Sequence, residues 1–215
     1  MDELWDYAVN EIQELWDWRQ KIANLYYEIR SSVNAENAWR LWCDTRAKMF
    51  EAHPQSPIEI GDRQDFRGPV TFPYDPSLRL SLGLVPATTE SVTVATGVDG
   101  ELSMKGFART QGLASRLGGE LTLYWIEGYG GGVFLPFKDA TSGVETYGGG
   151  RYLLDTIKGA DLGVVRADGE LTLDFNFAYF PSCAYSSRYV CPLAPLENRL
   201  TGAVRGGERL PFASI

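Results

Sequence analysis

The sequence has few cysteines and a single histidine, and both shortages narrow its chemistry. Its 215 residues include three cysteines, Cys43, Cys183 and Cys191, and one histidine, His53. An odd, low cysteine count argues against a disulfide framework, and a structural zinc site needs four ligands at paired spacings. We therefore expect no metal site. Cys183 and Cys191 are interpreted as a loop disulfide or as two buried thiols, and a metal site that combines them with carboxylates is the less favoured alternative.

The lone histidine also limits nucleophilic catalysis. Any Ser-His-Asp triad or Cys-His dyad must use His53, because the chain has no other histidine. His53 stands between Ala52 and Pro54, where a helical pattern ends. A histidine in that position more often caps a helix or packs on a sheet than it catalyses.

Basic residues are outnumbered by acidic ones, and long apolar runs are missing. Lysine and arginine number 20 against 28 aspartates and glutamates, which gives a net charge of −8. Such a surface repels nucleic-acid phosphates and anionic membranes. No apolar stretch is long enough to span a bilayer, and the start of the chain lacks the basic and apolar regions of a secretory signal. We expect a cytoplasmic protein with no nucleic-acid partner and no membrane partner.

Two helical patterns occupy residues 1–57. Residues 3–31 contain no proline or glycine, and their apolar side chains recur at spacings of three, four, six and seven. Asn34 can cap a second helix, which runs to about Ala52 before Pro54 and Pro57 end it. The sequence thus predicts a helical hairpin, which packs on the rest of the chain or on a second copy in a homodimer.

Residues 58–215 have the pattern of an antiparallel β domain. Glycine and proline become frequent, and turn dipeptides such as Asp99-Gly100 and Asp168-Gly169 are typical of hairpins. No long helical pattern interrupts this region, which argues against parallel βαβ winding. The expected strands are 78–85, 91–96, 102–110, 119–126, 133–138, 143–147, 151–156, 170–174 and 200–205. We predict an α+β protein in which an N-terminal helical hairpin packs on a mostly antiparallel β-barrel or sandwich, as one folding unit.

The residue choices in 129–198 exceed what a stable sheet requires. This region contains LPFKDAT at 135–141, ETYGGGRY at 145–152 and a segment at 174–198 rich in Tyr, Pro, Asp and Asn. Together with HPQSP at 53–57, these motifs resemble an uncharacterised bacterial family, domain of unknown function 1684. The resemblance covers most of the β region and implies no activity, because none is established for the family. One departure is Phe180, where the family usually carries Asn; if that Asn contacts a ligand, the ligand here differs.

Two glycine triplets, at 130–132 and 148–150, have two interpretations. Consecutive glycines can form an anion-binding nest or a loop that contacts a ligand. They also occur at tight bends and bulges of a curled sheet, which is the favoured interpretation here. Neither triplet belongs to a phosphate-binding motif that opens a helix, so we expect no nucleotide and no other cofactor.

Acidic side chains in residues 129–198 are the candidate catalytic groups. Asp139 and Glu145 flank a turn-like segment, and Asp174 and Asn176 share one face if their strand continues. Structural ion pairs and an Asx-type turn are the alternative interpretations. The predicted catalytic residues are Asp139, Glu145 and Asp174. The predicted ligand-binding residues are Tyr147, Arg151, Tyr152, Asn176, Tyr179, Tyr185, Glu197 and Asn198.

Two functional hypotheses follow from these residues. The first is a small-molecule binding protein, or an enzyme that uses carboxylate or tyrosine acid–base chemistry on a small polar molecule, with its pocket in the β-barrel. The second is a non-catalytic interaction module that acts through the Trp-rich helical hairpin, while the polar residues form a self-satisfied network. The convergence or scatter of the polar side chains distinguishes the two.

Overall fold

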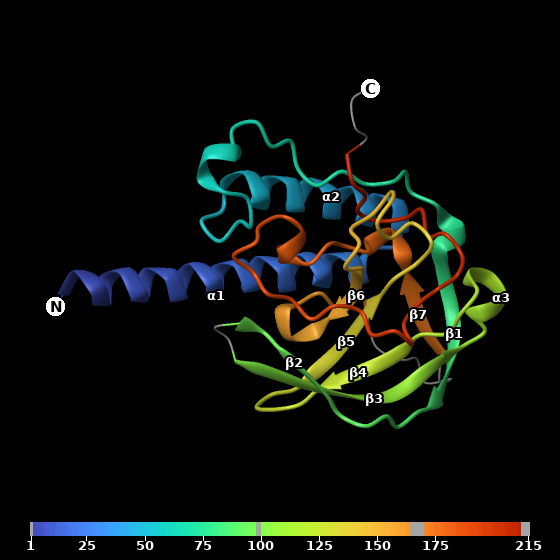
Figure 1. Cartoon of the computed structure of the whole chain (residues 1–215). Helices are drawn as coiled ribbons and strands as arrows, with labels where there is room; N and C mark the ends of the chain where they lie inside the picture. The colour runs from blue at the N-terminus through green and yellow to red at the C-terminus, as the bar shows by residue number, and fades with distance from the viewer. Residues whose placement is uncertain (1, 98–99, 164–169, 212–215) are drawn as a thin grey trace.

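The structure is a computed structural model that describes residues 2–97, 100–163 and 170–211, with side chains from residue 9 onward. Helices α1 (Asp2–Ser31) and α2 (Ala35–Ala52) form a hairpin. The two helices lie side by side over one side of the β-sheet, and the N-terminal half of α1 extends beyond the rest of the molecule (Figure 1). The predicted helical hairpin is therefore present, with nearly the predicted bounds.

Local signals in the sequence set the limits of α2. The Asn34 side chain accepts a hydrogen bond from the Asn37 N–H at 2.9 Å, which caps the first turn. At the other end the His53 N–H donates to the Met49 carbonyl at 2.9 Å, and Pro54 follows. His53 is thus the C-terminal cap of α2, as its position in the sequence favours.

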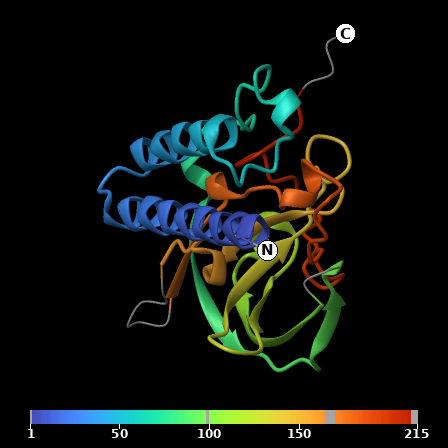
Figure 2. The ribbon, with the colours of Figure 1, turned by 90° about the vertical axis from the view of Figure 1, so that its left-hand side faces the viewer.

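In the described part of the chain, seven strands form one antiparallel sheet in the order β6-β5-β4-β3-β1-β7, with β2 paired to β3. The sheet curls into a half-barrel beneath the helices (Figure 2). The strands are β1 (Arg79–Pro86), β2 (Val92–Ala95), β3 (Glu101–Gln111), β4 (Thr122–Ile126), β5 (Gly132–Phe137), β6 (Arg151–Asp155) and β7 (Glu170–Asp174). Short helices precede, connect and follow the strands: η1 (Ile60–Asp62) and η2 (Pro76–Leu78) before β1, α3 (Ala114–Leu117) between β3 and β4, η4 (Thr156–Lys158) between β6 and β7, and η5 (Phe175–Phe177) and η6 (Ser182–Ala184) after β7.

The open side of the half-barrel is bridged by the chain that follows β7. Tyr179 exchanges two backbone hydrogen bonds with Tyr152 of β6, at 2.9 and 3.0 Å. This short bridge joins the two ends of the strand order without a regular strand. The fold is therefore α+β, with a half-barrel in place of a fully closed barrel.

Two of the predicted strands are wrong. In residues 143–147 the Thr141 carbonyl accepts the N–H groups of Val144, Glu145 and Thr146, so this segment is a compact turn. In residues 200–205 the backbone bonds go to separate elements: Leu200 N–H reaches Lys138 and Gly202 N–H reaches Leu117. A strand needs a ladder with one neighbour, which neither segment has.

The two Asp-Gly hairpin predictions have different outcomes. β2 and β3 pair as a hairpin around Asp99-Gly100, although residues 98–99 lie outside the described part of the chain. Asp168-Gly169 also lies outside the described residues. The described strands before and after it, β6 and β7, do not pair with each other, and a hairpin at Asp168-Gly169 itself stays a prediction.

The apolar core has a large part within the half-barrel and a second part beneath the helices. Beneath the helices, Tyr26 of α1 and Trp42 of α2 pack with Ala160 and Phe177 from the β region. Trp42 is fully buried, and its indole N–H donates to the Tyr26 hydroxyl at 3.2 Å. Helices and sheet therefore share buried surface, since neither could expose these rings to water without loss of hydrophobic stabilisation.

Candidate functional site

The predicted site residues do not gather in one cavity. Asp139 and Arg151 are buried together inside the fold, and Glu145 forms an exposed ion pair with Arg205 through two hydrogen bonds of 2.8 and 2.9 Å. Asp174 and Asn176 are buried elsewhere, near the turn of the helical hairpin. The three predicted catalytic carboxylates thus occupy three separate environments.

Arg151 is the centre of a buried network. Its Nη2 donates to Asp139 Oδ2 at 2.7 Å and to the Val204 carbonyl at 2.8 Å, and its Nη1 donates to the Gly206 carbonyl at 2.5 Å. Asp139 Oδ1 accepts the Thr141 N–H at 2.7 Å. Burial lowers the pKa of Arg151, while the charge of Asp139 opposes that shift. Because protein groups occupy almost all of these donors and acceptors, the network fixes the C-terminal segment against β6 and leaves little capacity for a ligand.

A second buried ion pair joins α2 to the end of the chain. Arg46 Nε donates to Glu208 Oε1 at 2.8 Å, and the Tyr185 hydroxyl donates to Glu208 Oε2 at 2.8 Å. The Arg46 guanidinium also lies about 5 Å from the ring centres of Trp42, Phe50 and Tyr179. Sequence reasoning missed Arg46 and Glu208. The available signal was a charged residue, Arg46, on the apolar stripe of α2.

Asn198 and Glu197 have structural contacts. The Asn198 amide accepts the Thr122 N–H at 2.8 Å and donates to the carbonyls of Thr122 and Pro136 at 2.9 and 2.8 Å, so it fastens β4 to β5. Glu197 accepts a hydrogen bond of 2.6 Å from the Tyr124 hydroxyl, and the pKa of Tyr124 is raised by burial and by this carboxylate. Each partner is a protein group.

The remaining predicted tyrosines surround the bridge and the cysteines. Tyr152 donates its hydroxyl to the Pro192 carbonyl at 2.5 Å and packs edge-on against Tyr179. Burial raises the pKa of both phenols well above 10. The Tyr147 hydroxyl lies 3.7 Å from Cys183 Sγ, outside the Arg151 network.

Asp174 differs from the other predicted residues because one of its oxygens lacks a hydrogen-bond partner. Its Oδ1 accepts the N–H and the side-chain amide of Asn176 at 3.1 and 2.8 Å, which makes an Asx-type turn after β7. Its Oδ2 is buried and accepts no hydrogen bond, and Arg79 Nη1 lies 3.9 Å away. Burial raises the pKa of Asp174. A buried polar atom of this kind needs an explanation, and a ligand or water site is one.

Asp174 lines a cavity of about 400 Å³ between the turn of the helical hairpin and the β1–β7 edge of the sheet. The helical side contributes Arg30 and Ser32, and the sheet contributes Arg79 and Thr172. Apolar walls come from Ile29, Ala38, Leu162 and Phe177. We call this the Asp174 cavity. Its lining is more polar than apolar and carries charged groups of both signs, so the cavity offers hydrogen-bond and ion-pair partners to a small polar ligand.

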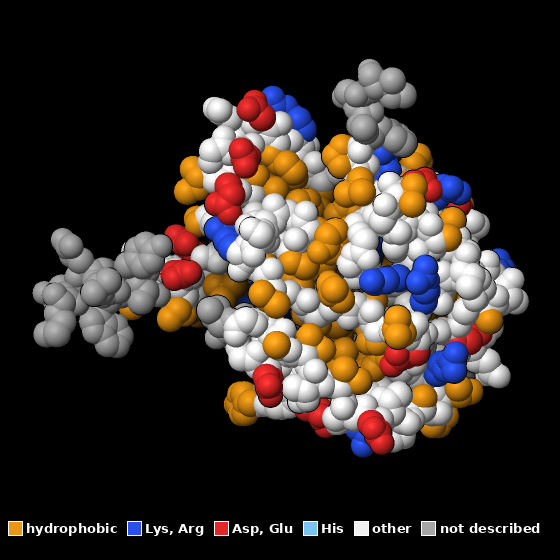
Figure 3. Space-filling view, viewed as in Figure 1, with side chains coloured by type: hydrophobic (Ala, Val, Ile, Leu, Met, Phe, Trp, Pro, Cys, Tyr) orange, Lys and Arg blue, Asp and Glu red, His pale blue; other side chains and the backbone are white. Residues whose placement is uncertain are grey.

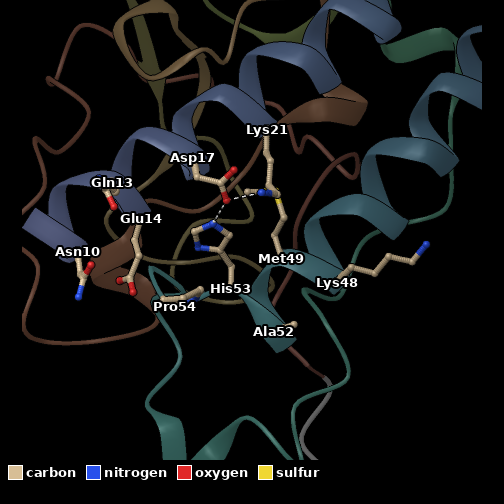
Figure 4. Close-up of a pocket in the computed structure, with 10 residues that line it drawn as sticks. All are labelled: Asn10, Gln13, Glu14, Asp17, Lys21, Lys48, Met49, Ala52, His53 and Pro54. Atoms are coloured by element: carbon tan, nitrogen blue, oxygen red, sulfur yellow. Dashed lines mark hydrogen bonds and ion pairs between the residues drawn. The ribbon is translucent and has the colours of Figure 1, made fainter.

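A larger and more open hollow of about 570 Å³ lies between α1 and the end of α2 (Figure 4). There His53 Nδ1 accepts the Gln55 N–H at 3.1 Å, so its Nε2–H donates to Asp17 Oδ2 at 2.9 Å. Lys21 also bonds to Asp17, and these two partners lower the pKa of the Asp17 carboxyl. His53, Asp17 and Lys21 are bonded to one another and join α1 to α2. This hollow therefore offers less to a ligand than the Asp174 cavity.

The described residues show neither a group of metal ligands nor a membrane-spanning helix. Within residues 2–97, 100–163 and 170–211, no three His, Cys, Asp or Glu side chains are grouped as metal ligands. No helix in that same part of the chain is both long and apolar enough to cross a membrane. The cytoplasmic location expected from the sequence stays a prediction.

Fold and cavity define a class of protein: a helical hairpin on a curled antiparallel half-barrel, with a small polar cavity where hairpin and sheet edge meet. The chain belongs to the family described as "Protein of unknown function (DUF1684)", whose model matches residues 64–209. It is similar to the solution NMR structure of the uncharacterized protein from gene locus rrnAC0354 of Haloarcula marismortui, with 34% identity and a TM-score of 0.56. That alignment covers 81% of this chain and 94% of the other. No curated protein matches this chain.

Proposed function

We propose that this protein binds a small carboxylate-containing molecule in the Asp174 cavity. The observation that carries the proposal is Asp174, which lines the cavity and whose buried Oδ2 has no hydrogen-bond partner. Structural contacts account for most polar atoms of the other predicted residues; the exception is Arg151 Nε, which is buried inside its own network and also lacks a hydrogen-bond partner. The cavity lies at the sheet edge under the helical hairpin and not in the barrel interior that the sequence suggested.

The charges around the cavity favour an anionic ligand. Arg79 is 45% exposed at its side chain and only loosely paired to Asp174, so its guanidinium can turn toward a ligand carboxylate. Arg30 also lines the cavity, and its Nη1 is held by the Asp161 carbonyl at 2.5 Å. Burial raises the pKa of Asp174, and in its protonated form the carboxyl can donate a hydrogen bond to the same ligand. If a reaction follows binding, Asp174 is the candidate acid–base group.

The test is a titration of the isotope-labelled protein with acetate, succinate and glutarate, followed by amide NMR. We expect succinate or glutarate to shift the signals of Gly163, Thr172 and Asp174. The variant Arg79→Met should bind at least tenfold more weakly, which corresponds to about 1.4 kcal/mol. Arg205→Met, which removes an exposed arginine from the distant Glu145 pair, is the matched control and should bind like wild type. If none of the three acids moves these signals, or Arg79→Met leaves affinity unchanged, the proposal is wrong.

A second candidate function rests on the part of α1 that extends from the body. Val9, Ile12 and Trp16 are spaced by three and four residues on this part, and Ile12 and Trp16 are 68% and 67% exposed. Hydrophobic side chains lie at the surface where this arm leaves the body (Figure 3). The other described tryptophans of the hairpin, Trp18, Trp39 and Trp42, pack on the core beneath the helices. The predicted interaction surface is therefore smaller than the whole Trp-rich hairpin.

A second copy of the chain is the partner that fits this arm. Residues 2–17 carry six acidic side chains and no basic one, and Arg19 and Lys21 follow directly. Two arms that pair antiparallel place the acidic half of each against Arg19 of the other, since Lys21 is already paired with Asp17 of its own helix. We expect sedimentation analysis to show a dimer that Ile12→Glu with Trp16→Glu converts to a monomer. Tyr27→Glu, which changes an equally exposed residue of the same helix, should leave the dimer intact. A monomeric wild-type protein at all concentrations contradicts this candidate.

A further inference from the structure

Cys183 and Cys191 lie in contact with each other on the segment that follows β7. The Cys183 N–H donates to Cys191 Sγ at 3.4 Å, which places the two cysteines side by side. Tyr147 lies in the connection between β5 and β6, and its hydroxyl is 3.7 Å from Cys183 Sγ. All three cysteines of the chain are free thiols, and both members of this pair are partly exposed. Reagents in solution can therefore reach them.

The surroundings of the pair make Cys183 the first nucleophile and leave Cys191 as the thiol that reacts second. Hydrogen bonds from Cys191 and then from Tyr147 lower the pKa of Cys183 to about 6, against the effect of burial. The same contact with Cys183, together with burial, strongly raises the pKa of Cys191. The pKa of Tyr147 is raised to about 12, so the phenol stays protonated and donates to the Cys183 thiolate. Cys183 is thus ionised first, and the thiolate is the reactive form of cysteine.

Cys43 provides an internal comparison. Burial raises its pKa to about 11, and its Sγ lies 3.8 Å from the Thr71 hydroxyl. No second thiol is near it among the described residues. Cys43 should therefore react slowly with the same reagents.

We propose that Cys183 and Cys191 form a redox-active thiol pair that closes to an intramolecular disulfide by exchange with a low-molecular-weight disulfide. The Cys183 thiolate attacks one sulfur of the small disulfide, whose other half leaves as a thiolate, and a mixed disulfide on Cys183 results. Cys191 then loses its proton to the departed thiolate and attacks Cys183 Sγ, which expels the second small thiolate. In total the protein gives up two electrons and two protons, and one small disulfide is reduced to two thiols.

The local fold is suited to this cross-link. Cys183 lies in η6, and Cys191 lies in a stretch without helix or strand, so neither sulfur is constrained by a sheet ladder. Tyr147 also packs against Phe180, at 6.2 Å between ring centres, and the Phe180 N–H donates to Glu208 Oε2 at 2.7 Å. The pair therefore lies on the side of the fold that holds the buried Arg46–Glu208 ion pair.

The test uses the reduced full-length protein, exposed to oxidised glutathione near neutral pH, followed by alkylation and mass spectrometry of the intact chain. We expect wild type to lose about 2 Da and to retain one alkylatable thiol, Cys43. Cys191→Ser should accumulate the glutathione adduct on Cys183, because the resolving thiol is missing. Cys183→Ser should form neither product quickly, and Cys43→Ser should behave like wild type. Three alkylatable thiols in the treated wild type, or an adduct on Cys191 in preference to Cys183, overturn the proposal.

A second measurement separates thiol activation from a general effect on folding. The rate of Cys183 alkylation by iodoacetamide should rise with pH through a midpoint near 6, and Tyr147→Phe should move that midpoint upward. Circular dichroism of the same samples checks that the variant is folded. A midpoint in the ordinary thiol range near 8.5 for folded wild type contradicts the assigned role of Cys183.

Discussion

Arg79 and Asp174 are directly opposite each other on β1 and β7, but their side chains do not hydrogen bond: Arg79 Nη1 and Asp174 Oδ2 are 3.9 Å apart. The arginine is half exposed while the carboxyl is buried. A buried carboxyl without a close cation keeps its proton more tightly than in water, which is why burial dominates the raised pKa of Asp174.

This relationship predicts how Asp174 affects stability with pH. The folded pKa lies above the unfolded value of about 3.8, so the contribution of Asp174 is fully present below that value. It is lost as pH rises through the folded pKa, because the unfolded state ionises more readily. Asp174→Asn keeps an oxygen acceptor for Asn176 and cannot ionise. We expect its free energy of unfolding, relative to wild type, to increase from about pH 4 upward and then level off.

Urea denaturation across this pH range measures the difference. Glu127→Gln, which neutralises an exposed carboxylate just after β4, is the control and should show no such rise. A constant difference between Asp174→Asn and wild type contradicts the raised pKa and, with it, the proton-donating role in the Asp174 cavity.

The ion pair between Arg46 and Glu208 should be sensitive to substitution. Both side chains are almost fully buried, and Glu208 also accepts hydrogen bonds from Tyr185 and Phe180. Removal of one partner leaves an uncompensated buried charge, so Arg46→Met should cost about 3–5 kcal/mol of unfolding free energy. Chemical denaturation measures this loss. The double variant with Glu208→Gln should cost less than the sum of the single variants, since the two residues interact.

Sequence patterns predicted the helices and most strands because these depend on neighbours along the chain. The spacing of apolar residues in α1 and the cap at Asn34 are local signals, and the structure confirms them. Residues 143–147 and 200–205 were also predicted as strands, but the first segment closes a turn on the Thr141 carbonyl and the second bonds to distant acceptors such as the Lys138 carbonyl. Periodicity does not contain that information.

In the candidate site too, the sequence revealed features that depend on neighbours along the chain and missed those that only the fold creates. Asp174 was singled out because it follows a strand-like run, but Arg30 and Arg79 were not, since only the folded chain brings the helical turn against the sheet edge. Arg46 and Glu208 are 162 residues apart in sequence, and no pattern joins them. Asp139, Glu145 and Asp174 looked alike as carboxylates. Their environments separated them: a buried ion pair, an exposed ion pair and an unpaired oxygen.

Asn198 should be required for the junction of β4 and β5. Its amide makes three hydrogen bonds to the backbone of Thr122 and Pro136. Asn198→Asp keeps the side-chain volume but replaces the two donations with a charged oxygen facing two carbonyls. We expect a loss of about 2–4 kcal/mol, from unmade hydrogen bonds and unfavourable charge. Hydrogen exchange should show faster exchange of the Thr122 amide, whereas Asn37→Ala on the exposed face of α2 should change neither quantity.

Gly150 should resist substitution because of its backbone and its surroundings. Its φ is +96°, and an added Cβ would lie 2.6 Å from the Phe137 carbonyl oxygen, so alanine there is strained and crowded. The residue directly precedes Arg151, and the strand start must shift to relieve the contact. We expect Gly150→Ala to lose about 1–3 kcal/mol in thermal or urea unfolding. Gly61→Ala, at a glycine with nothing within 4 Å of the added Cβ, should stay within about 0.5 kcal/mol of wild type. Equal effects of the two changes would mean that the turn before β6 relaxes freely and does not hold Arg151 in its buried network.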